Sequence, residues 1–504
     1  MSSEDYQMLA KTFEGLEKVL KVELETIGAV NVQEEVSGVS FSGSKEVLYK
    51  ANFCCRTAIR VLRVIGQFKI MNSSELYHTV YHLNWSDYLD VSQSFAIYSS
   101  VDNKAFNNAT LINLKVKDAI VDHFKAKSRK RPTLNTENPD VVIYAHASTD
   151  SLTLSIDSSG EPLNKRGYRV GQNDASMNEV MAAGILKLVG WDGKCDLYDT
   201  MCGSGTIPVE AALMARNIPP GMFRKEFAFE KWSDFDADLL EEVYNEDYEV
   251  PFEHRIYASD ISPINIRVSE INAKNAGVLK DIELVAADFA DLVPQSEKGM
   301  LVVNPPAEER KRDRFTDPVY GVIGDQLRRG FKGFKAWVFS NSEQGFKNIG
   351  LRPGNEFAIM NGTVEYNLRL FEMFSGAARS KENSSDRPFQ KQRSANSKRE
   401  QPGRRRTAPV SDNRGDRRSS AFVNSRNDID KKQRDDFRKS EKKAFDSAEE
   451  RRSKFHEMRR NNLFEPKKDS LKEKDDSGQN SASEKQTPEN GSSSRSGKRP
   501  RTKR

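Results

Sequence analysis

Between residues 178 and 371, short apolar runs alternate with longer segments in which apolar residues recur every three or four positions. The longer segments are typical of amphipathic helices and the short runs of buried strands. Strand, crossover helix and next strand in this rhythm predict a parallel, doubly wound sheet. A final run at 365–371 is expected to be an antiparallel strand that ends the sheet. The other strands are expected at 196–198, 255–258, 282–286, 299–303 and 336–340.

The first 157 residues have a different pattern. Residues 4–60 predict the order strand, helix, strand, strand, helix. The apolar residues that share one face of the first helix are Leu16, Val19, Leu20 and Leu24. Residues 61–157 predict further short strands around one long helix, for which a small antiparallel sheet with helices on it is the natural arrangement. An α+β module therefore precedes the α/β domain. The strands of its second part are expected at 95–100, 141–146 and 152–156, and the helix at 111–127.

The last part of the chain, 377–504, is rich in Ser, Asn, Gln and charged residues, and its apolar residues have no period. It cannot bury enough apolar surface to offset the entropy lost on ordering, so we expect it to be disordered. It holds 37 Lys and Arg against 21 Asp and Glu, a net charge of +16, and since the whole chain is +5 the preceding part is −11. A basic tail on an acidic body predicts a polyanionic partner; a merely solubilising role is the alternative.

Composition argues against several classes of protein. The four cysteines, at 54, 55, 195 and 202, have neither the spacing of a zinc site nor the framework of a small secreted domain. The six histidines are scattered, so we expect no metal and no histidine-based nucleophile. The N-terminus has acidic residues where a signal peptide needs a basic flank, and no run approaches the roughly 18 apolar residues of a membrane span. We expect a soluble, cytoplasmic protein, and no obligate protein partner is indicated.

A glycine-rich turn lies between a predicted strand and a predicted helix. The segment Asp199-Thr-Met-Cys-Gly-Ser-Gly-Thr206 follows Leu197-Tyr198 and opens the helix 207–215. This order lets the backbone approach a ligand closely, with the amides of the helix N-terminus facing it. A structural turn without a ligand is the alternative. The candidate cofactor-binding residues of the turn are Asp199, Cys202, Gly203 and Gly205.

Acidic residues end the next two strands. Asp260 closes Tyr257-Ala-Ser-Asp260, where a carboxylate can accept hydrogen bonds from both ribose hydroxyls of a nucleoside-containing cofactor. Asp288 follows the third strand, where it could bond an adenine amino group. The interval from Asp199 to Asp260 is much longer than the usual one of about 20 residues, so an insertion is expected at 217–253. Taken singly, each acid has helix capping as its alternative role.

The sequence Asn304-Pro305-Pro306 follows the apolar run Leu301-Val-Val. An exocyclic base amine is a poor nucleophile because its lone pair is delocalised into the ring. Two acceptors, the Asn304 side-chain oxygen and the Pro305 carbonyl, would hold the amine hydrogens and turn the nitrogen towards a methyl donor. The prolines fix an extended backbone that aims both oxygens at one point. We therefore expect Asn304, Pro305 and Pro306 to be catalytic; a Pro-Pro turn without a catalytic role is the alternative.

Taken together, these motifs resemble those of the THUMP-containing class I methyltransferases of the bacterial large-subunit (23S) ribosomal RNA guanine-N2 type, formerly described as N6-adenine-specific DNA methylases. The resemblance covers residues 1 to about 375 and is highly specific. It rests on Ala51-Asn-Phe-Cys-Cys-Arg-Thr-Ala-Ile-Arg60, Leu114-Lys-Val-Lys-Asp-Ala-Ile-Val-Asp122, Glu137-Asn-Pro-Asp140, Gly160-Glu-Pro-Leu-Asn-Lys-Arg-Gly-Tyr-Arg169, Asp199 to Glu210, and Pro219-Pro-Gly-Met222.

The resemblance implies a division of the chain. It implies a ferredoxin-like unit at 1–60, a THUMP RNA-binding domain at 61–160 and a catalytic domain at 161–376 that binds S-adenosyl-L-methionine. The predicted fold class is thus α/β, a Rossmann-like doubly wound sheet preceded by an α+β ferredoxin-like and THUMP module and followed by the disordered basic tail, 377–504.

Two basic segments are candidates for RNA binding. Five basic residues in the seven positions 125–131 predict a phosphate-contacting loop at the end of the long helix. The resemblance adds the basic and aromatic stretch before the catalytic domain, which suits phosphate and base contacts. A solvated helix end and a solvated linker are the alternatives. The candidates are Lys125, Lys127, Arg129, Lys130, Arg131, Lys165, Arg166, Tyr168 and Arg169.

Two stretches depart from the family pattern. Residues 173–178, implied to pack over the methionine part of the cofactor, are Asn-Asp-Ala-Ser-Met-Asn where Ala-Pro-Leu-Lys-Glu-Asn is usual. The second departure is larger, because the usual Asn-Pro-Pro-Tyr-Gly is here Asn304-Pro-Pro-Ala-Glu308. The family's tyrosine is expected to stack on the flipped target base, a contact worth roughly 1–3 kcal/mol. Either another aromatic residue, Phe289 or Tyr320, replaces it, or the catalytic site has decayed.

The main hypothesis is an active S-adenosylmethionine-dependent methyltransferase of guanine N2 in large-subunit ribosomal RNA, which needs no metal and no covalent enzyme intermediate. One alternative is a non-catalytic RNA-binding or ribosome-assembly factor; Ala307 and Glu308 favour it, and the intact acids and Asn304 oppose it. The other is an adenine-N6 DNA methyltransferase, since Asn-Pro-Pro does not distinguish the two amines. The THUMP-like module argues for RNA.

Overall fold

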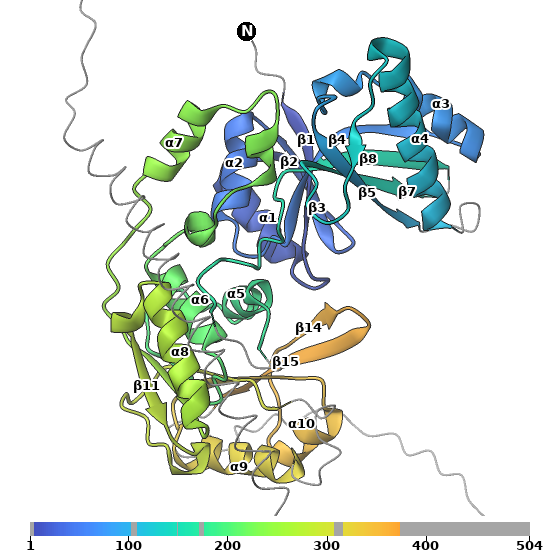
Figure 1. Ribbon diagram of the computed structural model, residues 1–504. Helices are drawn as coiled ribbons and strands as arrows, with labels where there is room; N and C mark the ends of the chain where they lie inside the picture. Colours follow the sequence, from blue (N-terminus) through green and yellow to red (C-terminus); the bar gives the residue numbers. More distant parts are fainter. Residues whose placement is uncertain (1–4, 102–107, 149, 171–175, 307–315, 373–504) are drawn as a thin grey trace, which may run out of the picture. The chain divides into compact units, whose positions relative to one another are not determined.

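The computed structural model describes residues 5–101, 108–148, 150–170, 176–306 and 316–372 (Figure 1). The predicted disordered tail, 377–504, lies outside these ranges, as do Ala307 and Glu308.

The N-terminal unit has the predicted order of elements. Its first helix buries Leu20 and Leu24 of the predicted apolar face. The second begins after Ser44, whose hydroxyl accepts a hydrogen bond from the Val47 amide and so caps the helix. The elements are β1 (Tyr6–Lys11), α1 (Glu17–Thr26), β2 (Val30–Glu35), β3 (Gly38–Gly43) and α2 (Lys45–Cys54).

The next unit continues the same sheet. Its elements are β4 (Arg60–Lys69), α3 (Ser73–Tyr81), η1 (Trp85–Asp87), β5 (Ser94–Val101), α4 (Ala109–Ser128), β6 (Thr133–Leu134), β7 (Val141–Ala147) and β8 (Ser151–Asp157). Strand β4 is antiparallel to β1 on one side and to β8 on the other. This pairing produces one eight-stranded sheet with the order β2-β3-β1-β4-β8-β7-β5-β6.

The expectation of a small antiparallel sheet for residues 61–157 is wrong in the direction of some strands, because β5 is parallel to β6 and β7. The sheet is also larger than expected, since it includes the strands of the N-terminal unit. In the chain, helix α4 connects β5 to β6 and β7. Because a helical crossover brings the chain back to the same end of the sheet, the strands that it connects are parallel.

The third part forms the predicted doubly wound sheet. Strands β9 to β13 are parallel, and β15 runs antiparallel to β13 as expected. Strand β14, which pairs with β15 at the edge of the sheet as far as the described residues show, is an addition to the prediction. The strands, in the order β11-β10-β9-β12-β13-β15-β14, are β9 (Leu197–Asp199), β10 (Ile256–Asp260), β11 (Ile282–Ala286), β12 (Met300–Val303), β13 (Lys335–Ser340), β14 (Glu356–Asn361) and β15 (Val364–Glu372).

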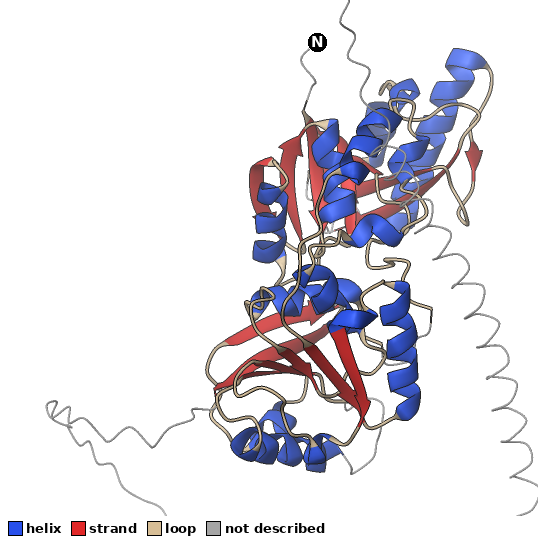
Figure 2. Cartoon of the chain, turned by 90° about the vertical axis from the view of Figure 1, so that its left-hand side faces the viewer, coloured by secondary structure: helices blue, strands red, loops and turns tan. Residues whose placement is uncertain are grey.

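Helices cover both faces of this sheet (Figure 2). Leu197 and Val302 belong to one buried cluster, which contains residues of α5, α6 and α8. Tyr198 and Leu301, the neighbours of these residues along their strands, belong to another, with residues of α9 and α10. Alternate strand residues thus face opposite helical layers. The helices are α5 (Glu179–Leu188), α6 (Thr206–Ala215), α8 (Pro263–Asn275), α9 (Thr316–Arg329) and α10 (Glu343–Ile349), with short turns η4 (Leu279–Asp281) and η5 (Phe289–Asp291).

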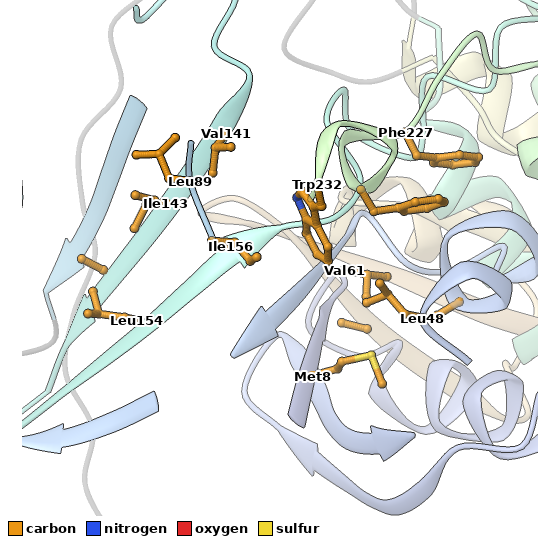
Figure 3. Packing of buried hydrophobic residues seen from close by; sticks show 14 of the residues in the cluster. Met8, Leu48, Val61, Leu89, Val141, Ile143, Leu154, Ile156, Phe227 and Trp232 are labelled. Atoms are coloured by element: carbon orange, nitrogen blue, oxygen red, sulfur yellow. The ribbon is translucent and has the colours of Figure 1, made fainter. Parts of the chain in front are cut away.

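The expected insertion contains η2 (Pro220–Phe223), η3 (Ala228–Lys231) and α7 (Ala237–Asn245). Most of its aromatic residues belong to the buried cluster of the N-terminal units, and Phe227 and Trp232 lie in that cluster with Met8 (Figure 3). Phe223 and Phe252 pack against the cluster of the catalytic domain. Phe229 stacks on Tyr49 of α2 with ring centroids 4.3 Å apart. The insertion therefore links the catalytic sheet to the module before it.

Candidate active site

The order of the parallel strands determines where a ligand can bind. Strand β9 lies between β10 and β12, so the chain winds away from β9 in both directions. Such a reversal leaves a crevice at the carboxyl ends of the strands, where ligands of doubly wound sheets bind. The glycine turn, Asp260 and Asn304 all follow the carboxyl ends of these three strands or lie at them.

The glycine turn is held in place by the neighbouring strand. Gly203 and Gly205 have φ angles of +57° and +79°, which glycine adopts without strain. A Cβ atom on Gly205 would lie 2.8 Å from the Ser269 side chain, so this glycine lets α6 start close to α8. The amide of Cys202 donates to the Ser259 carbonyl at 3.0 Å, and the amide of Gly203 to Asp260 Oδ2 at 3.0 Å.

The carboxylate of Asp260 is fixed by three hydrogen bonds. In addition to the Gly203 amide, it accepts from the Ser262 amide at 2.9 Å and from Asn265 Nδ2 at 3.0 Å, both on Oδ1. A carboxylate has about four acceptor positions. One therefore remains on Oδ2, which is enough for one ribose hydroxyl rather than the two expected.

Asp199 is the most unusual acid of the site. It is 1% exposed, and its Oδ1 accepts from the Met201 amide at 3.3 Å. Its Oδ2 has no hydrogen-bond partner within the described residues, and the same holds for Thr200 Oγ1. Burial raises the pKa of Asp199 to about 8, and the charge of Asp260 adds to the rise. An unpartnered buried acceptor is costly, so this carboxylate fits a cationic or hydrogen-bond-donating ligand.

One cavity of about 750 Å³ brings most of the predicted residues together, a size typical of sites for small molecules. It extends from the glycine turn to the Asn-Pro-Pro segment after β12. Gly205 does not line it, and its role is to start α6. The predicted residues that line the cavity are Asp199, Cys202, Gly203, Asp260, Asp288, Asn304, Pro305 and Pro306.

Several residues of the cavity escaped the sequence analysis. Met181 lines it near the glycine turn, and Asn341, Asn361 and Tyr366 line it near the end of β13 and the β14–β15 hairpin. The sequence does contain an indication of the hairpin, because Gly362 begins a two-residue connection between two β-prone runs. In the structure Gly362 has a φ of +64°, a conformation that suits such a turn.

The two aromatic residues expected to replace the family's tyrosine cannot stack on a base. Phe289 is 3% exposed and Tyr320 is 1% exposed. The Tyr320 hydroxyl lies 2.6 Å from Ser340 Oγ, within the layer between α9 and the sheet. That suggestion is therefore wrong, because Tyr320 does not line the cavity and Phe289 lines it with only 3% of its surface exposed, too little for a base to stack on.

Part of the predicted RNA-binding linker is also corrected. Arg166 and Tyr168 are each 1% exposed, so neither can contact a phosphate or a base. Arg166 pairs with Glu210 of α6 at 3.4 Å, and the Tyr168 hydroxyl donates to the same carboxylate at 3.0 Å. These side chains fix the linker to the catalytic domain instead.

Arg169 has a supporting role beside the glycine turn. Its guanidinium pairs with Glu179 of α5 at 2.6 Å and donates to Ser204 Oγ and Thr206 Oγ1 at 3.0 and 2.8 Å. Lys165 differs from it, since 60% of its side chain is exposed. Of the four linker residues, Lys165 alone has a largely exposed side chain, and its contact with RNA remains a prediction.

The basic cluster at the end of α4 is exposed throughout. Arg129 ends the helix with φ +56°, a left-handed conformation that turns the chain back. A hollow there is lined by Lys125, Arg129, Lys130 and Arg131, with Lys127 nearby on α4. The arrangement suits phosphates, and the predicted RNA contact of these five residues stays a prediction.

The described residues contain neither a candidate membrane span nor a candidate metal site. Within the described ranges, no helix is long and apolar enough to cross a membrane. The same residues contain no group of three or more His, Cys, Asp or Glu that could hold a metal ion.

Comparison with known proteins supports a methyltransferase site in this cavity. Residues 166–369 match the RMKL-like methyltransferase domain, 72–157 the THUMP domain and 7–62 the RlmL ferredoxin-like domain. A protein of Synechocystis sp. named "Putative RNA methyltransferase slr0064" is 34% identical over 364 residues, which are 71% of this chain and 95% of that protein. The chain belongs to the RMKL-like methyltransferase family. The family resemblance and the fold class predicted from sequence are thereby confirmed.

This RMKL-like methyltransferase also resembles longer proteins. "Ribosomal RNA large subunit methyltransferase K/L" of Psychromonas ingrahamii is 36% identical over 372 residues, 72% of this chain but 49% of that protein. The chain thus spans about half the length of the K/L relatives. Among solved structures, that of SMU.472 complexed with SAH has a TM-score of 0.67 and 28% identity, and the match covers 75% of this chain and 100% of that one.

Proposed function

We propose that this protein is an S-adenosylmethionine-dependent RNA methyltransferase that modifies guanine N2 in large-subunit ribosomal RNA. One observation carries the proposal: a single cavity is lined by the glycine turn, by the acids that follow three successive strands and by Asn304-Pro305-Pro306. A place for a nucleoside cofactor is thereby joined to two acceptors for an amine. The THUMP domain and the names of the K/L relatives support ribosomal RNA as substrate.

The cofactor is S-adenosyl-L-methionine, and the residues present fit it. The unpartnered Asp199 carboxylate oxygen suits the ammonium group of the methionine part. Asp260 has one acceptor position for a ribose hydroxyl, and Asp288 lines the cavity where it can accept from the adenine amine. SMU.472, at 28% identity, was crystallised with SAH, the demethylated form of this cofactor. When bound, the cofactor supplies a methyl group made electrophilic by the sulfonium.

The chain's own residues act on the base amine. The Asn304 side-chain oxygen and the Pro305 carbonyl accept its two hydrogens, which localises the nitrogen lone pair and fixes its direction. Pro305 is buried, and Met181 and Phe339 contribute apolar surface to the cavity. In a site partly screened from water each hydrogen bond is stronger than in bulk water, and losing one costs about 10²–10³ in rate.

The full chain, assayed with labelled S-adenosylmethionine, tests substrate and amine together. Ribosomal RNA from cells that lack the protein is compared with duplex DNA, and the modified nucleoside is identified by mass spectrometry. We expect transfer to RNA with N2-methylguanosine as product. Transfer to DNA alone, with N6-methyl-2′-deoxyadenosine as product, would establish the adenine-N6 DNA activity instead.

A second candidate function is that of a non-catalytic RNA-binding or ribosome-assembly factor. The observation that favours it is Ala307-Glu308 in place of the family's Tyr-Gly. A non-catalytic factor would bind ribosomal RNA in a filter-binding assay but would transfer no methyl group to it. Transfer above the no-enzyme background in the same preparation would exclude it.

A further inference from the structure

The β14–β15 hairpin contributes an aromatic side chain to the cavity. Tyr366 of β15 lines it together with Phe289 and Phe339 (Figure 1 shows the hairpin in orange). Phe289 and Phe339 are 3% and 2% exposed, whereas Tyr366 is only partly buried. Among the described aromatic residues of the cavity, Tyr366 is thus the one with ring surface left to offer a ligand.

The ring of Tyr366 is held in a fixed orientation. It stacks on Phe339 of β13 with ring centroids 4.9 Å apart and an angle of 11° between the planes. Such nearly parallel packing leaves one ring face against Phe339 and the other away from it. The Tyr366 hydroxyl has no hydrogen-bond partner within the described residues. The side chain therefore retains both a stacking surface and a polar group.

The register of the sheet places this pair beside the amine acceptors. Val303 of β12 lies opposite Val338 of β13, so Asn304, the residue after β12, lies level with Phe339, which is still within β13. Strand β15 pairs with the other edge of β13. Two strand spacings, roughly 10 Å, separate β12 from β15. Asn304 and Tyr366 thus line the same cavity about two strand spacings apart, a separation that a purine hydrogen-bonded at Asn304 can span.

From this arrangement we propose that Tyr366 stacks on the target base and takes the place of the tyrosine that the Asn-Pro-Pro segment of this chain lacks. The inference rests on the proposed function, since it needs a base amine at Asn304 and Pro305. Stacking on a hairpin residue positions the ring plane of the base, while Asn304 and Pro305 fix its amine. The free hydroxyl adds a donor or acceptor to the edge of the base pocket.

The test compares variants of two aromatic residues of the same hairpin, Tyr366 and Phe357. Tyr366→Leu removes the stacking ring, and Tyr366→Phe keeps it. Phe357→Leu is the matched control, because Phe357 of β14 stacks on Trp337 of β13 at 5.6 Å but does not line the cavity. Steady-state kinetics are measured with labelled S-adenosylmethionine and ribosomal RNA from cells lacking the protein, and SAH affinity is measured by calorimetry.

We expect Tyr366→Leu to lower kcat/KM for RNA roughly 5- to 100-fold, the range of one lost base stack. Its SAH affinity should stay within about twofold of wild type, since the cofactor residues are untouched. Tyr366→Phe should retain at least a third of the wild-type kcat/KM, and Phe357→Leu should match wild type. If Tyr366→Leu proves unstable in thermal unfolding, Tyr366→Met, which still covers Phe339, takes its place.

The two proposals fail in different ways. An active wild type whose Tyr366→Leu variant is equally active overturns the role of Tyr366 alone. A similar loss in Phe357→Leu and Tyr366→Leu also overturns it, because the hairpin then acts only through its fold. A wild type that transfers no methyl group to RNA overturns the proposed function, and the role of Tyr366 with it.

Discussion

Individual side chains of the site have properties that can be measured directly, and Asp199 is the clearest case. Burial raises its pKa from an ordinary 3.8 to about 8. Between these values the folded protein keeps a proton that the unfolded chain has released, so the stability that this proton contributes is lost as pH rises through the window. The free energy of unfolding of the cofactor-free wild type should therefore fall, relative to Asp199→Asn, from about pH 5 to about pH 8.

Urea unfolding at several pH values checks this prediction. Asp199→Asn is the appropriate reference because it keeps the shape of the side chain and does not titrate. Parallel curves for the two proteins over this range would contradict the prediction, because they would mean that Asp199 is ionised throughout in the folded state.

The buried pair of Arg166 and Glu210 leads to a second prediction. Both side chains are at most 1% exposed, and losing one partner leaves the other charge buried without compensation. Arg166→Met should lower the free energy of unfolding by about 3–5 kcal/mol. Lys165→Met, next in sequence but exposed, should leave stability nearly unchanged and weaken RNA retention at low salt. Equal stability of the two variants in chemical denaturation would contradict the buried pair.

These two residues also show where sequence reasoning failed. Lys165 to Arg169 is a basic and aromatic stretch, which composition and family position assigned to RNA. Its neutralising partner, Glu210, lies 44 residues from Arg166 along the chain, on α6. The local pattern holds no trace of this partner, so the sequence could not distinguish a buried arginine from an exposed one.

At the level of elements, the start of α6 permits a sharp comparison between two glycines. Gly205→Ala combines a φ of +79° with a Cβ only 2.8 Å from the Ser269 side chain. It should lower the free energy of unfolding by about 2–4 kcal/mol. Gly203→Ala has a similar φ of +57° but nothing within 4 Å, and should lower it by about 1–2 kcal/mol. Thermal or urea unfolding distinguishes them, and equal effects would argue against close packing of the turn.

Strong periodicity explains which elements were predicted. The parallel strands β9 to β13 were foreseen because each is a short apolar run between helical segments, and β9, β12 and β13 are almost wholly buried, although the edge strand β11 is largely exposed. The acids and Asn304 were foreseen because they follow such runs. Strand β14 was missed because it is a partly exposed edge strand. Tyr366 was missed with it, since its place at the cavity depends on the pairing of β15 with β13.

The parallel pairing of β5 with β7 was missed for a related reason. Alternating patterns identify strands and their buried faces, but the direction of pairing depends on the connection between them. Here the connection includes α4, and the neighbours are chosen across the whole eight-stranded sheet.

For the whole molecule, charge separation leads to a prediction about RNA binding. Residues 377–504 carry a net charge of +16, and the rest of the chain −11. Deleting 377–504 should weaken RNA binding at low salt and flatten its dependence on salt concentration, because fewer counterions are released. Filter binding across a salt series measures both. Unchanged affinity at low salt would show that the segment has no role in RNA binding.

The central claim concerns Asn304, which is expected to hold the base amine beside the methyl donor. The most direct test is labelled methyl transfer from S-adenosylmethionine to ribosomal RNA of cells lacking the protein, with wild type, Asn304→Ala and the control Asn348→Ala, whose residue lies on α10 away from the cavity. We predict that Asn304→Ala loses at least about 100-fold in rate while it still binds SAH, and that Asn348→Ala matches wild type. Undiminished transfer by Asn304→Ala, or RNA binding by the wild type without any transfer, would contradict the account.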